Sequence, residues 1–385
     1  MRVVVNGWFW GQEATGSGQY TRRLAEALAL NHPQLEIVVV VPSGAETDAG
    51  QALGNLRLVS VAKHAKAAGP LAKVWFEQVS FPRMCVRLGA DVAHVPYWAS
   101  PLWDSVPTLV TIHDLIPLVL AEYRGGPFVR LYTWLVSQSA RRAHTVLTDS
   151  EASQRDIAFH LHRPDAQVIP LAAEARYTPI AAPDDVAVRK HYGLPDRYWL
   201  YLGGFDVRKN LGVVMAAYRW ASRTANAACP LVIAGRLPAQ DTSFTPDPRR
   251  LAREQGLPSQ AVRFLGAVAD AEKPALYRGA LAFLFPSRYE GFGLPPLEAL
   301  ACGTPVVASA ASAIPEVVGD AGALLPPDDA EGMGAALVRL ATVPNHRAGL
   351  SQRAADRVAL FSWERTACET LAAYQAALAQ ASGTG

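Results

Sequence analysis

The sequence has few cysteines, no long apolar run and almost no net charge. Its 385 residues include four cysteines, Cys85, Cys229, Cys302 and Cys368, which lie far apart and form no Cys-x-x-Cys pair. This spacing argues against a structural zinc site or a disulfide framework and favours a reducing compartment. The most apolar stretches, such as residues 37–41 and 115–120, are far too short to span a membrane. Because the formal net charge is only +2, charge gives no argument for nucleic-acid binding.

Common catalytic and metal-binding motifs are also missing. There is no Gly-x-Ser-x-Gly motif, and no cysteine lies beside a histidine in a recognisable nucleophile–base arrangement. The acid pairs Asp184-Asp185 and Asp328-Asp329 fall in proline-rich turns, so we expect no metal site and no metal cofactor. The chain starts with a strand-like run instead of a basic segment followed by a long apolar one. We therefore predict no signal peptide and a cytoplasmic protein.

Short strand-like runs alternate with helical stretches along most of the chain. Strand-like runs occur at residues 2–6, 36–41, 91–94, 108–112 and 145–148, and again at 199–202, 231–234, 262–264, 282–285 and 306–308. Prolines accumulate between the two series. The alternation predicts an α/β protein with two Rossmann-like, doubly wound parallel-sheet domains. We place them at residues 1–174 and 175–362, and expect a last helix, residues 363–380, to pack back on the first domain.

The most informative stretch runs from Ser287 to Gly303, after a strand-like run. Gly291 and Gly293 allow the backbone to approach a ligand closely, and the amides at the start of the next helix, residues 295–302, favour an anion or a sugar oxygen. Glu290 lies in the loop at the carboxyl end of a strand, where open α/β sheets bind ligands. Glu298 lies about one turn into the helix. The alternative is that Glu290 is a solvated loop acid and Glu298 only complements the helix dipole.

This stretch, Glu290-x7-Glu298 preceded by Pro286-Ser287 and followed by Gly303-Thr304-Pro305-Val306-Val307, strongly resembles glycosyltransferase family 4. The resemblance extends over nearly the whole chain. It includes Gly16-Ser17-Gly18-Gln19-Tyr20, Thr111-Ile112-His113-Asp114-Leu115, Asp149-Ser150, Gly203-Gly204-Phe205-Asp206-Val207-Arg208-Lys209-Asn210, Ile233-Ala234-Gly235, Phe264-Leu265-Gly266, Ile314-Pro315-Glu316-Val317-Val318-Gly319 and Phe361-Ser362-Trp363. It implies a retaining enzyme of the GT-B fold, in which two Rossmann-like domains face a central cleft.

The resemblance also implies roles in the C-terminal, donor-binding domain. Glu290 would contact hydroxyls of the transferred sugar, and Glu298 the ribose hydroxyls of the nucleotide. Arg208 and Lys209 would neutralise the diphosphate leaving group, which is where negative charge develops in the transition state. Further contacts to the sugar and diphosphate would come from the loop at Gly204 and from the amides of Phe292, Gly293 and Leu294. Relatives often carry Gly-Arg where this chain has Gly203-Gly204, so Arg208 is a candidate replacement for that arginine. The alternative for Arg208-Lys209 is a solvated loop.

Two segments of the N-terminal, acceptor-binding domain complete the predicted site. By likeness to the family, His113 would point toward the sugar and the departing phosphate. Gly16 and Gly18, in the loop after the first strand, would let their amides meet the phosphate from the N-terminal side. The alternatives are a structural histidine and, for the neighbouring Asp114, a turn cap.

The resemblance implies transfer of a hexose from a GDP- or UDP-linked nucleotide sugar to a glycan or polyprenyl-diphosphate-linked acceptor, without a metal. The His-Asp-Leu-x-Pro form at residues 113–117 is most similar to bacterial mannosyltransferases of surface-polysaccharide assembly, which favours GDP-mannose. Two alternatives stay open: a nucleotide-sugar epimerase of the same architecture, and a catalytically silent sugar-nucleotide-binding partner. Two carboxylates would also suit a glycosidase, but their position around a helix start favours transfer.

One segment, residues 57–87, combines basic and aromatic side chains. Its basic residues are Arg57, Lys63, Lys66, Lys73, Arg83 and Arg87, its aromatic ones Trp75, Phe76 and Phe81, and its single acid is Glu77. Such a composition suits the surface of an anionic membrane, so we predict a peripheral contact with the cytoplasmic face of the membrane here. The alternative is an ordinary helix with a solvated face.

Overall fold

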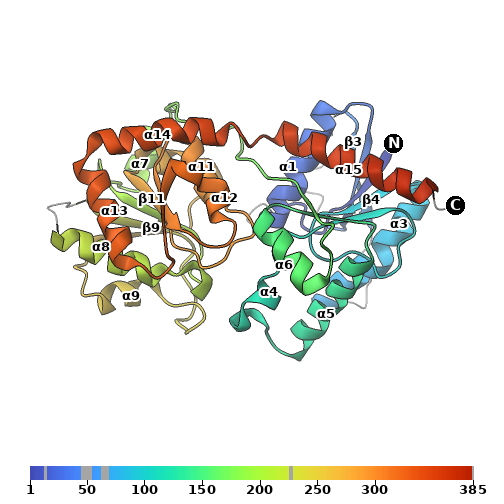
Figure 1. Ribbon diagram of the computed structural model, residues 1–385, viewed down its shortest axis with the longest axis horizontal. Coiled ribbons are helices and arrows are strands. Elements are labelled where there is room, and N and C mark those ends of the chain that lie inside the picture. Colours follow the sequence, from blue (N-terminus) through green and yellow to red (C-terminus); the bar gives the residue numbers. More distant parts are fainter. Residues whose placement is uncertain (13–14, 45–53, 62–68, 225–228, 384–385) are drawn as a thin grey trace. The chain divides into compact units, whose positions relative to one another are not determined.

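The computed structural model describes residues 1–12, 15–44, 54–61, 69–224 and 229–383. The chain divides into two compact units, shown in Figure 1. Unit 1 comprises Met1–Leu171 and Ser362–Gly385, and unit 2 comprises Ala172–Phe361. The boundary that we placed between residues 174 and 175 lies close to this division.

In the described part of unit 1, seven strands form one sheet whose neighbours all pair in parallel, in the order β3-β2-β1-β4-β5-β6-β7. The strands are β1 (Arg2–Asn6), β2 (Glu36–Pro42), β3 (Leu56–Val61), β4 (Val92–Val95), β5 (Thr108–Thr111), β6 (Thr145–Thr148) and β7 (Gln167–Val168). The helices are α1 (Gly16–Asn31), α2 (Pro70–Trp75), α3 (Phe81–Leu88), α4 (Ile116–Val119), α5 (Pro127–Arg142), α6 (Glu151–Leu161) and α15 (Trp363–Gly383). A π-helical turn, η1 (Phe76–Ser80), joins α2 to α3, and a 3₁₀ turn, η2 (Ala121–Tyr123), follows α4.

The described part of unit 2 contains a six-stranded parallel sheet in the order β10-β9-β8-β11-β12-β13. Its strands are β8 (Trp199–Leu202), β9 (Leu231–Ala234), β10 (Val262–Gly266), β11 (Ala282–Phe285), β12 (Val306–Ser309) and β13 (Gly322–Leu325). Its helices are α7 (Asp185–His191), α8 (Leu211–Thr224), α9 (Pro248–Glu254), α10 (Lys273–Gly279), α11 (Leu294–Ala301), α12 (Ile314–Val318), α13 (Ala330–Thr342) and α14 (Pro344–Val358). Three 3₁₀ turns, η3 (Val207–Lys209), η4 (Asp270–Glu272) and η5 (Gly319–Ala321), lie among them.

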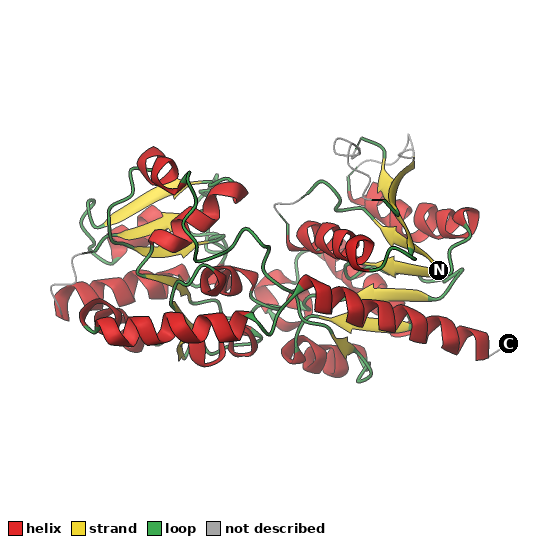
Figure 2. Cartoon of the chain, turned by 90° about the horizontal axis from the view of Figure 1, so that it is seen from above, coloured by secondary structure: helices red, strands yellow, loops and turns green. Residues whose placement is uncertain are grey.

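The central strands are almost continuously apolar because helices cover both faces of each sheet, as Figure 2 shows. The valines of β1 and β2 are buried, and so are all residues of β8, β9, β11 and β12. The predicted fold class, two Rossmann-like doubly wound domains, is therefore confirmed. The strands that the sequence analysis missed are β3, β7 and β13, which lie at or near the sheet edges and are only partly buried.

The C-terminal helix α15 belongs to unit 1, where it lies alongside α1 in both Figure 1 and Figure 2. The hydroxyl of Tyr374 on α15 is 2.7 Å from Nδ1 of buried His94, whose Nε2 is 2.8 Å from Oγ1 of Thr111. Burial lowers the pKa of His94 to about 3, so the ring is neutral and donates through one nitrogen while it accepts through the other. The hydroxyl of Thr366 donates to the Pro170 carbonyl over 2.7 Å. This polar network fixes the helix on the sheet.

The order of the strands reverses at one point in each sheet, between β1 and β4 in unit 1 and between β8 and β11 in unit 2. Loops that leave the carboxyl ends of two such strands run to opposite faces of the sheet, and open α/β sheets bind ligands between them. In unit 2 these loops carry Arg208 and Lys209 after β8, and Glu290 after β11. The topology thus brings together residues about 80 positions apart in the sequence.

All four cysteines are free thiols, three of them buried and Cys368 exposed. Among the described residues, no helix has the length and apolar character that a membrane span requires.

Candidate functional site

A buried cluster of charge forms where the loops after β8 and β11 meet. The carboxylate of Glu290 is 2.6 Å from Nη1 of Arg208 and 2.7 Å from Nζ of Lys209. The three side chains are between 12% and 14% exposed, so neither Glu290 nor the two cations are the solvated loop residues of the alternative interpretation. The carboxylate of Asp206 lies 3.6 Å from Nε of Arg208, so the cluster contains two cations and two acids.

The two cations decide the ionisation of Glu290. Burial alone would raise the pKa of this carboxyl group, but the charges of Lys209 and Arg208 outweigh it and hold the pKa below its ordinary value. Glu290 is therefore ionised at neutral pH. A carboxylate has about four lone-pair positions, so Glu290 can accept further hydrogen bonds from hydroxyl groups while both ion pairs persist.

Backbone hydrogen bonds hold the two loops together. The amide of Arg288 donates to the carbonyl of Arg208 over 2.8 Å, and Nη1 of Arg208 donates to the carbonyl of Tyr289 over 2.8 Å. The hydroxyl of Ser312, which follows β12, donates to the carbonyl of Glu290 over 2.7 Å. Lys209 Nζ also lies over the Phe285 ring, 5.2 Å from its centroid. The position of Glu290 is thus set by contacts from three successive strand ends.

The segment between Glu290 and α11 presents backbone donors. Gly293, the N-cap of α11, has φ of 120°, a conformation that favours glycine. Pro295 and Pro296 have no N–H group, and the Leu297 amide donates to the Gly293 carbonyl. In the part of the chain that the structure describes, the amides of Phe292, Gly293 and Leu294 form no hydrogen bond. These are the three amides that the sequence analysis assigned to the ligand.

The carboxyl group of Glu298 faces the interior of unit 2. The side chain is buried, and the Tyr277 hydroxyl donates to it over 3.0 Å. Burial raises its pKa to about 7, although the charge of Lys273 and the hydroxyls of Tyr277 and Tyr177 act in the opposite direction. The group is thus more than a complement to the dipole of α11, because it is buried and accepts a hydrogen bond from a tyrosine hydroxyl.

Gly204 is exposed in the loop after β8, and its carbonyl accepts a 2.5 Å hydrogen bond from the hydroxyl of Tyr201. A close backbone contact between Gly203 and Gly235 fixes this loop against the loop after β9. A Cβ atom added at Gly235, where φ is 155°, would lie 2.1 Å from the carbonyl oxygen of Gly203. Only glycine fits there, so the loop ends after β8 and β9 are locked against each other.

In unit 1, His113 is held at both ring nitrogens. Nδ1 lies 2.7 Å from the Asp149 carboxylate and Nε2 lies 3.2 Å from the carbonyl of Pro96. Both partners are acceptors, so this geometry requires a proton on each nitrogen. Burial alone would lower the pKa of His113, but the Asp149 charge and hydrogen bond outweigh it and raise the pKa above its ordinary value. Asp149 was quoted as part of a motif in the sequence but not assigned to the site. Its pairing with His113 across adjacent strands could not be found from spacing alone.

The glycines at the start of α1 differ in their surroundings. The amide of Gly18 donates to Oγ1 of Thr15, the N-cap, over 3.1 Å, and this hydrogen bond uses the donor that we had assigned to a phosphate. A Cβ atom at Gly18 would lie 2.2 Å from the carbonyl oxygen of Gln12, whereas one at Gly16 would meet no described atom within 4 Å. Gly18 is therefore required by packing of the loop. Asp114 accepts from the amide of Ile116 over 3.1 Å, as expected of a turn cap.

Among the described basic residues of this segment, Arg57, Arg83 and Arg87 are exposed, whereas Lys73 is packed. Lys63 and Lys66 lie outside the described residues. The ammonium group of Lys73 lies 5.1 to 5.2 Å from the ring centroids of Phe9, Tyr97 and Tyr132 and 3.6 Å from buried Glu77. Phe76 and Phe81 are core residues, while Trp75 is 40% exposed. Lys73 and Glu77 thus form an ion pair that is packed against aromatic rings.

Three of the four acids in the pairs Asp184-Asp185 and Asp328-Asp329 make contacts within unit 2. Asp185 forms an ion pair with Arg278, and Asp329 caps α13 through the amide of Gly332. Asp328 lies 3.1 Å from Arg288. No group of three or more His, Cys, Asp and Glu side chains within the described ranges is arranged to hold a metal ion.

Two family models match the chain. The model described as "Glycosyl transferase 4-like domain" matches residues 15–172, and the model "Glycosyl transferases group 1" matches residues 196–342. The O-antigen chain mannosyltransferase B of Escherichia coli is 32% identical over 270 residues, which cover 69% of this chain and 70% of that protein. The MMP alpha-(1->4)-mannosyltransferase of Mycolicibacterium hassiacum is 30% identical over 76% of this chain and 69% of its own length. The serotype-specific mannosyltransferase WbdA of E. coli is 29% identical over 69% of this chain, which spans only 33% of that protein.

Solved structures of similar fold cover nearly the whole chain. Sucrose-phosphate synthase from Thermosynechococcus elongatus superposes with a TM-score of 0.78 over 99% of this chain and 100% of its own, at 24% identity. Anabaena Alr3699/HepE in complex with UDP-glucose superposes with a TM-score of 0.71 over 97% of this chain and 100% of its own, at 17% identity. These likenesses show that the chain has the GT-B fold.

The raised pKa of Glu298 predicts a pH dependence of stability. A carboxyl group with a pKa of about 7 in the folded state and near 4.5 when unfolded stabilises the fold most below pH 4.5, and this contribution is lost as the pH rises through 7. In Glu298→Gln this dependence should disappear. Relative to the variant, the wild type should lose about 2 kcal/mol of unfolding free energy between pH 5 and pH 8.

Urea denaturation of both proteins at the two pH values measures the difference. Glu331→Gln, which removes an exposed acid of α13, is the matched control and should follow the wild type. Parallel stability curves for the wild type and Glu298→Gln would contradict the buried, protonatable state of Glu298.

Proposed function

Because the chain belongs to the glycosyltransferase family whose 4-like and group 1 domains it contains, we propose that it transfers mannose from GDP-mannose, with retention of configuration, to a hydroxyl of a glycan or lipid-linked saccharide. Three relatives named as mannosyltransferases support the choice of sugar. The observation that carries the proposal is the pair of cations held against Glu290, beside three unbonded backbone amides, where the strand order of unit 2 reverses.

The charge of this cluster suits a nucleoside diphosphate leaving group. When the bond between the anomeric carbon and the diphosphate oxygen breaks, its electron pair moves onto that oxygen and concentrates negative charge on the phosphates. Lys209 has three N–H donors and uses one on Glu290, so the others can meet a phosphate oxygen. Arg208 adds a second fixed charge. Because both cations are already in place and partly buried, they stabilise the transition state with little reorganisation.

Glu290 would hold the transferred sugar by accepting hydrogen bonds from its hydroxyls. It is buried beside cations that keep it ionised, so it remains an acceptor throughout the neutral pH range. In the step that we propose, the acceptor hydroxyl attacks the anomeric carbon from the face that the diphosphate leaves. Its proton passes to the departing phosphate oxygen, and no enzyme nucleophile is required. Glu290 then acts as a positioning group for the sugar.

Glu298 would accept hydrogen bonds from the ribose hydroxyls of the donor. Its carboxyl group accepts one hydrogen bond, from the Tyr277 hydroxyl, which leaves lone-pair positions for a ribose. Deprotonation of Glu298 when the donor binds would leave its carboxylate free to accept these hydrogen bonds. The site that we propose therefore extends from Glu290 at the sugar to Glu298 at the nucleoside.

His113 would contribute charge from unit 1 as a positioning residue. Both of its N–H groups already have partners, so its positive charge, and not a free donor, is what it offers to a phosphate. The cations of unit 2 make a metal ion unnecessary for the leaving group in this scheme, and we propose metal-independent transfer in the cytoplasm.

The reaction is tested by incubating the protein with GDP-mannose and a mannose-terminated oligosaccharide. We expect release of GDP and an acceptor enlarged by one mannose, at an unchanged rate in excess EDTA. GDP-glucose and UDP-glucose serve as control donors. A donor isomer without an enlarged acceptor would indicate an epimerase, and loss of transfer in EDTA that Mg²⁺ or Mn²⁺ restores would overturn the metal-independent scheme.

The same assay tests the charge cluster. Lys209→Ala and Glu290→Gln should each lower turnover about tenfold or more, since both remove contacts that strengthen in the transition state. The matched controls are Lys190→Ala and Glu331→Gln, exposed residues of unit 2 that should retain the wild-type rate. Thermal melts establish that the variants are folded. Wild-type turnover in both site variants would contradict the assignment.

A further inference from the structure

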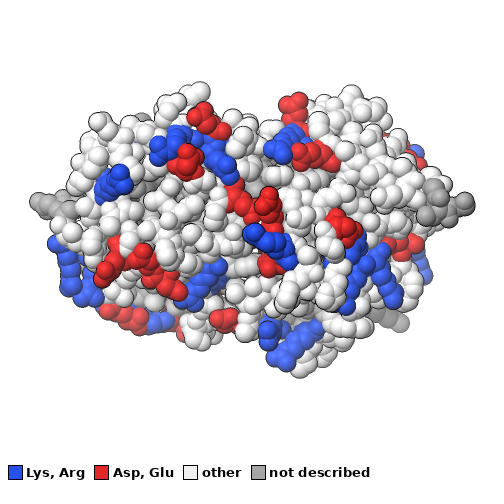
Figure 3. Space-filling view, viewed as in Figure 1, with Lys and Arg blue, Asp and Glu red and all other residues white. Residues whose placement is uncertain are grey.

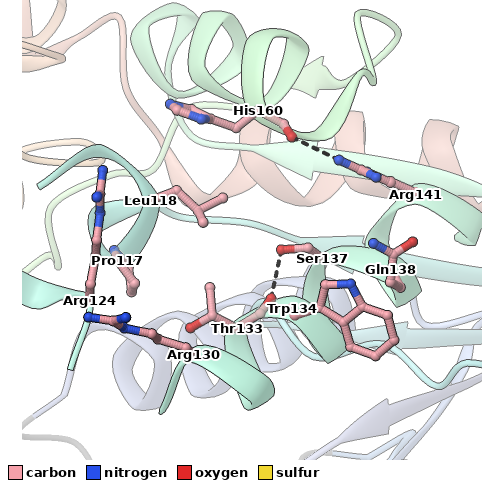
Figure 4. Close-up of a pocket in the computed structure, with 10 residues that line it drawn as sticks. All are labelled: Pro117, Leu118, Arg124, Arg130, Thr133, Trp134, Ser137, Gln138, Arg141 and His160. Carbon is pink, nitrogen blue, oxygen red and sulfur yellow. Dashed lines mark hydrogen bonds between the residues drawn. The ribbon is translucent and has the colours of Figure 1, made fainter. Parts of the chain in front are cut away.

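A basic pocket lies on unit 1, and none of the residues assigned above to the transferred sugar or the diphosphate lines it. It is formed by α4, α5 and α6, has a volume of about 450 Å³ and is shown in Figure 4. Its lining contains Arg124, Arg130, Arg141 and His160, the indole of Trp134, and no acidic residue. Figure 4 shows Arg124 and Arg130 at one end of the pocket and Arg141 at the other.

The arginines of this pocket are not held by carboxylates. Nη2 of Arg141 donates to the carbonyl of His160 over 3.2 Å, and Nε of Arg130 donates to the carbonyl of Gly125 over 3.3 Å. Throughout the described ranges, no acid forms an ion pair with Arg124, Arg130 or Arg141. Residues 116–142 contain four arginines and one acid, Glu122, although the whole chain is nearly balanced. In Figure 3, basic side chains gather at the lower edge of the face shown, over the α4–α5 region.

Large apolar side chains of α5 and α6, the helices that form the pocket, are exposed to solvent. On α5, Phe128 is 88% exposed, Leu131 62% and Trp134 57%, while the opposite face of this helix packs through Val136 and Ala140. Phe159 on α6 is 76% exposed, and its ring lies 4.9 Å from that of His160 in the pocket lining. Contiguous exposed apolar side chains of this size mark an interaction surface.

We propose that this surface, which we call the α5 face, docks on a lipid bilayer that contains anionic lipids. The α5 face comprises Arg124, Phe128, Arg130, Leu131, Trp134, Arg141, Phe159 and His160. The arginines meet the lipid phosphates at the pocket, and the phenylalanines, the leucine and the indole enter the interface between headgroups and acyl chains. A helix whose exposed side chains are both apolar and cationic suits this boundary.

Charge complementarity and the apolar residues together favour a bilayer. A free phosphate would satisfy the arginines but leaves the three apolar side chains of α5 in water. An anionic membrane surface supplies both environments, and each basic residue near it strengthens attraction. This docking does not depend on the transfer chemistry, so its test is separate from the assay of activity. If the proposed function is correct, docking of the α5 face would bring unit 1 to a lipid-linked acceptor.

The test is sedimentation of the whole chain with vesicles of phosphatidylcholine alone or with phosphatidylglycerol added. We expect binding to the anionic vesicles, little binding to the neutral ones, and weaker binding as salt is increased. Arg124→Gln/Arg130→Gln/Arg141→Gln should bind at least about tenfold more weakly. The control Arg197→Gln/Arg223→Gln/Arg347→Gln removes the same charge from unit 2 and should bind like the wild type.

A second pair of variants tests the apolar contribution. Phe128→Ser/Leu131→Ser should also weaken binding to anionic vesicles, whereas Ile180→Ser/Val186→Ser, which alters equally exposed apolar residues of unit 2, should not. Thermal melts exclude unfolding, which is not expected at such exposed positions. Equal binding to neutral and anionic vesicles, or equal losses in the α5 variants and their controls, would overturn the proposal. So would an effect of the arginine variant alone, because the apolar residues would then lie outside the contact.

Discussion

Glu290 lies within 2.6 to 2.7 Å of both Arg208 and Lys209, in surroundings that leave about a seventh of each side chain exposed. A buried ion pair is a poor source of stability, because desolvation offsets much of the attraction. Asp206, 3.6 Å from Nε of Arg208, adds a second acid, so four partly buried charges gather at this strand end. Such clusters are enriched at ligand sites, and Lys209 keeps N–H groups that can meet an anion. The remaining features of unit 2 at this site keep these three groups together.

The parallel sheets explain how distant residues reach this position. In unit 2, β8 and β11 are neighbours although about 80 residues separate them, and the reversal of strand order between them directs their loops to opposite faces. Gly235 and Gly293 adopt backbone conformations that suit glycine, and at Gly235 the absence of a Cβ atom lets the loops approach closely. Unit 1 uses the equivalent strand ends differently. There, buried hydrogen bonds link His94 to Thr111 and to Tyr374 of α15, and a partly buried one links His113 to Asp149.

Much of this architecture follows from the sequence, because buried parallel strands are short and largely apolar. Residues 2–6, 145–148, 199–202, 231–234 and 282–285 were predicted with the bounds that the structure has. The strands β3, β7 and β13 escaped because partly buried strands near an edge lack a continuous apolar pattern. The glycine and acid pattern near Glu290 identified the candidate site. Side-chain partners could not be predicted in the same way: the pairing of His113 with Asp149, the capping use of the Gly18 amide and the burial of Lys73 against Glu77 all depend on three-dimensional packing.

A crystal structure of the chain with GDP bound would test the central claim most directly, because that claim concerns where a diphosphate lies. The account predicts phosphate oxygens within hydrogen-bonding distance of Lys209 Nζ and of the Gly293 or Leu294 amide, with the ribose hydroxyls at the carboxylate of Glu298. GDP bound elsewhere, with Lys209 contacting only Glu290 and the amides before α11 still unbonded, would contradict it.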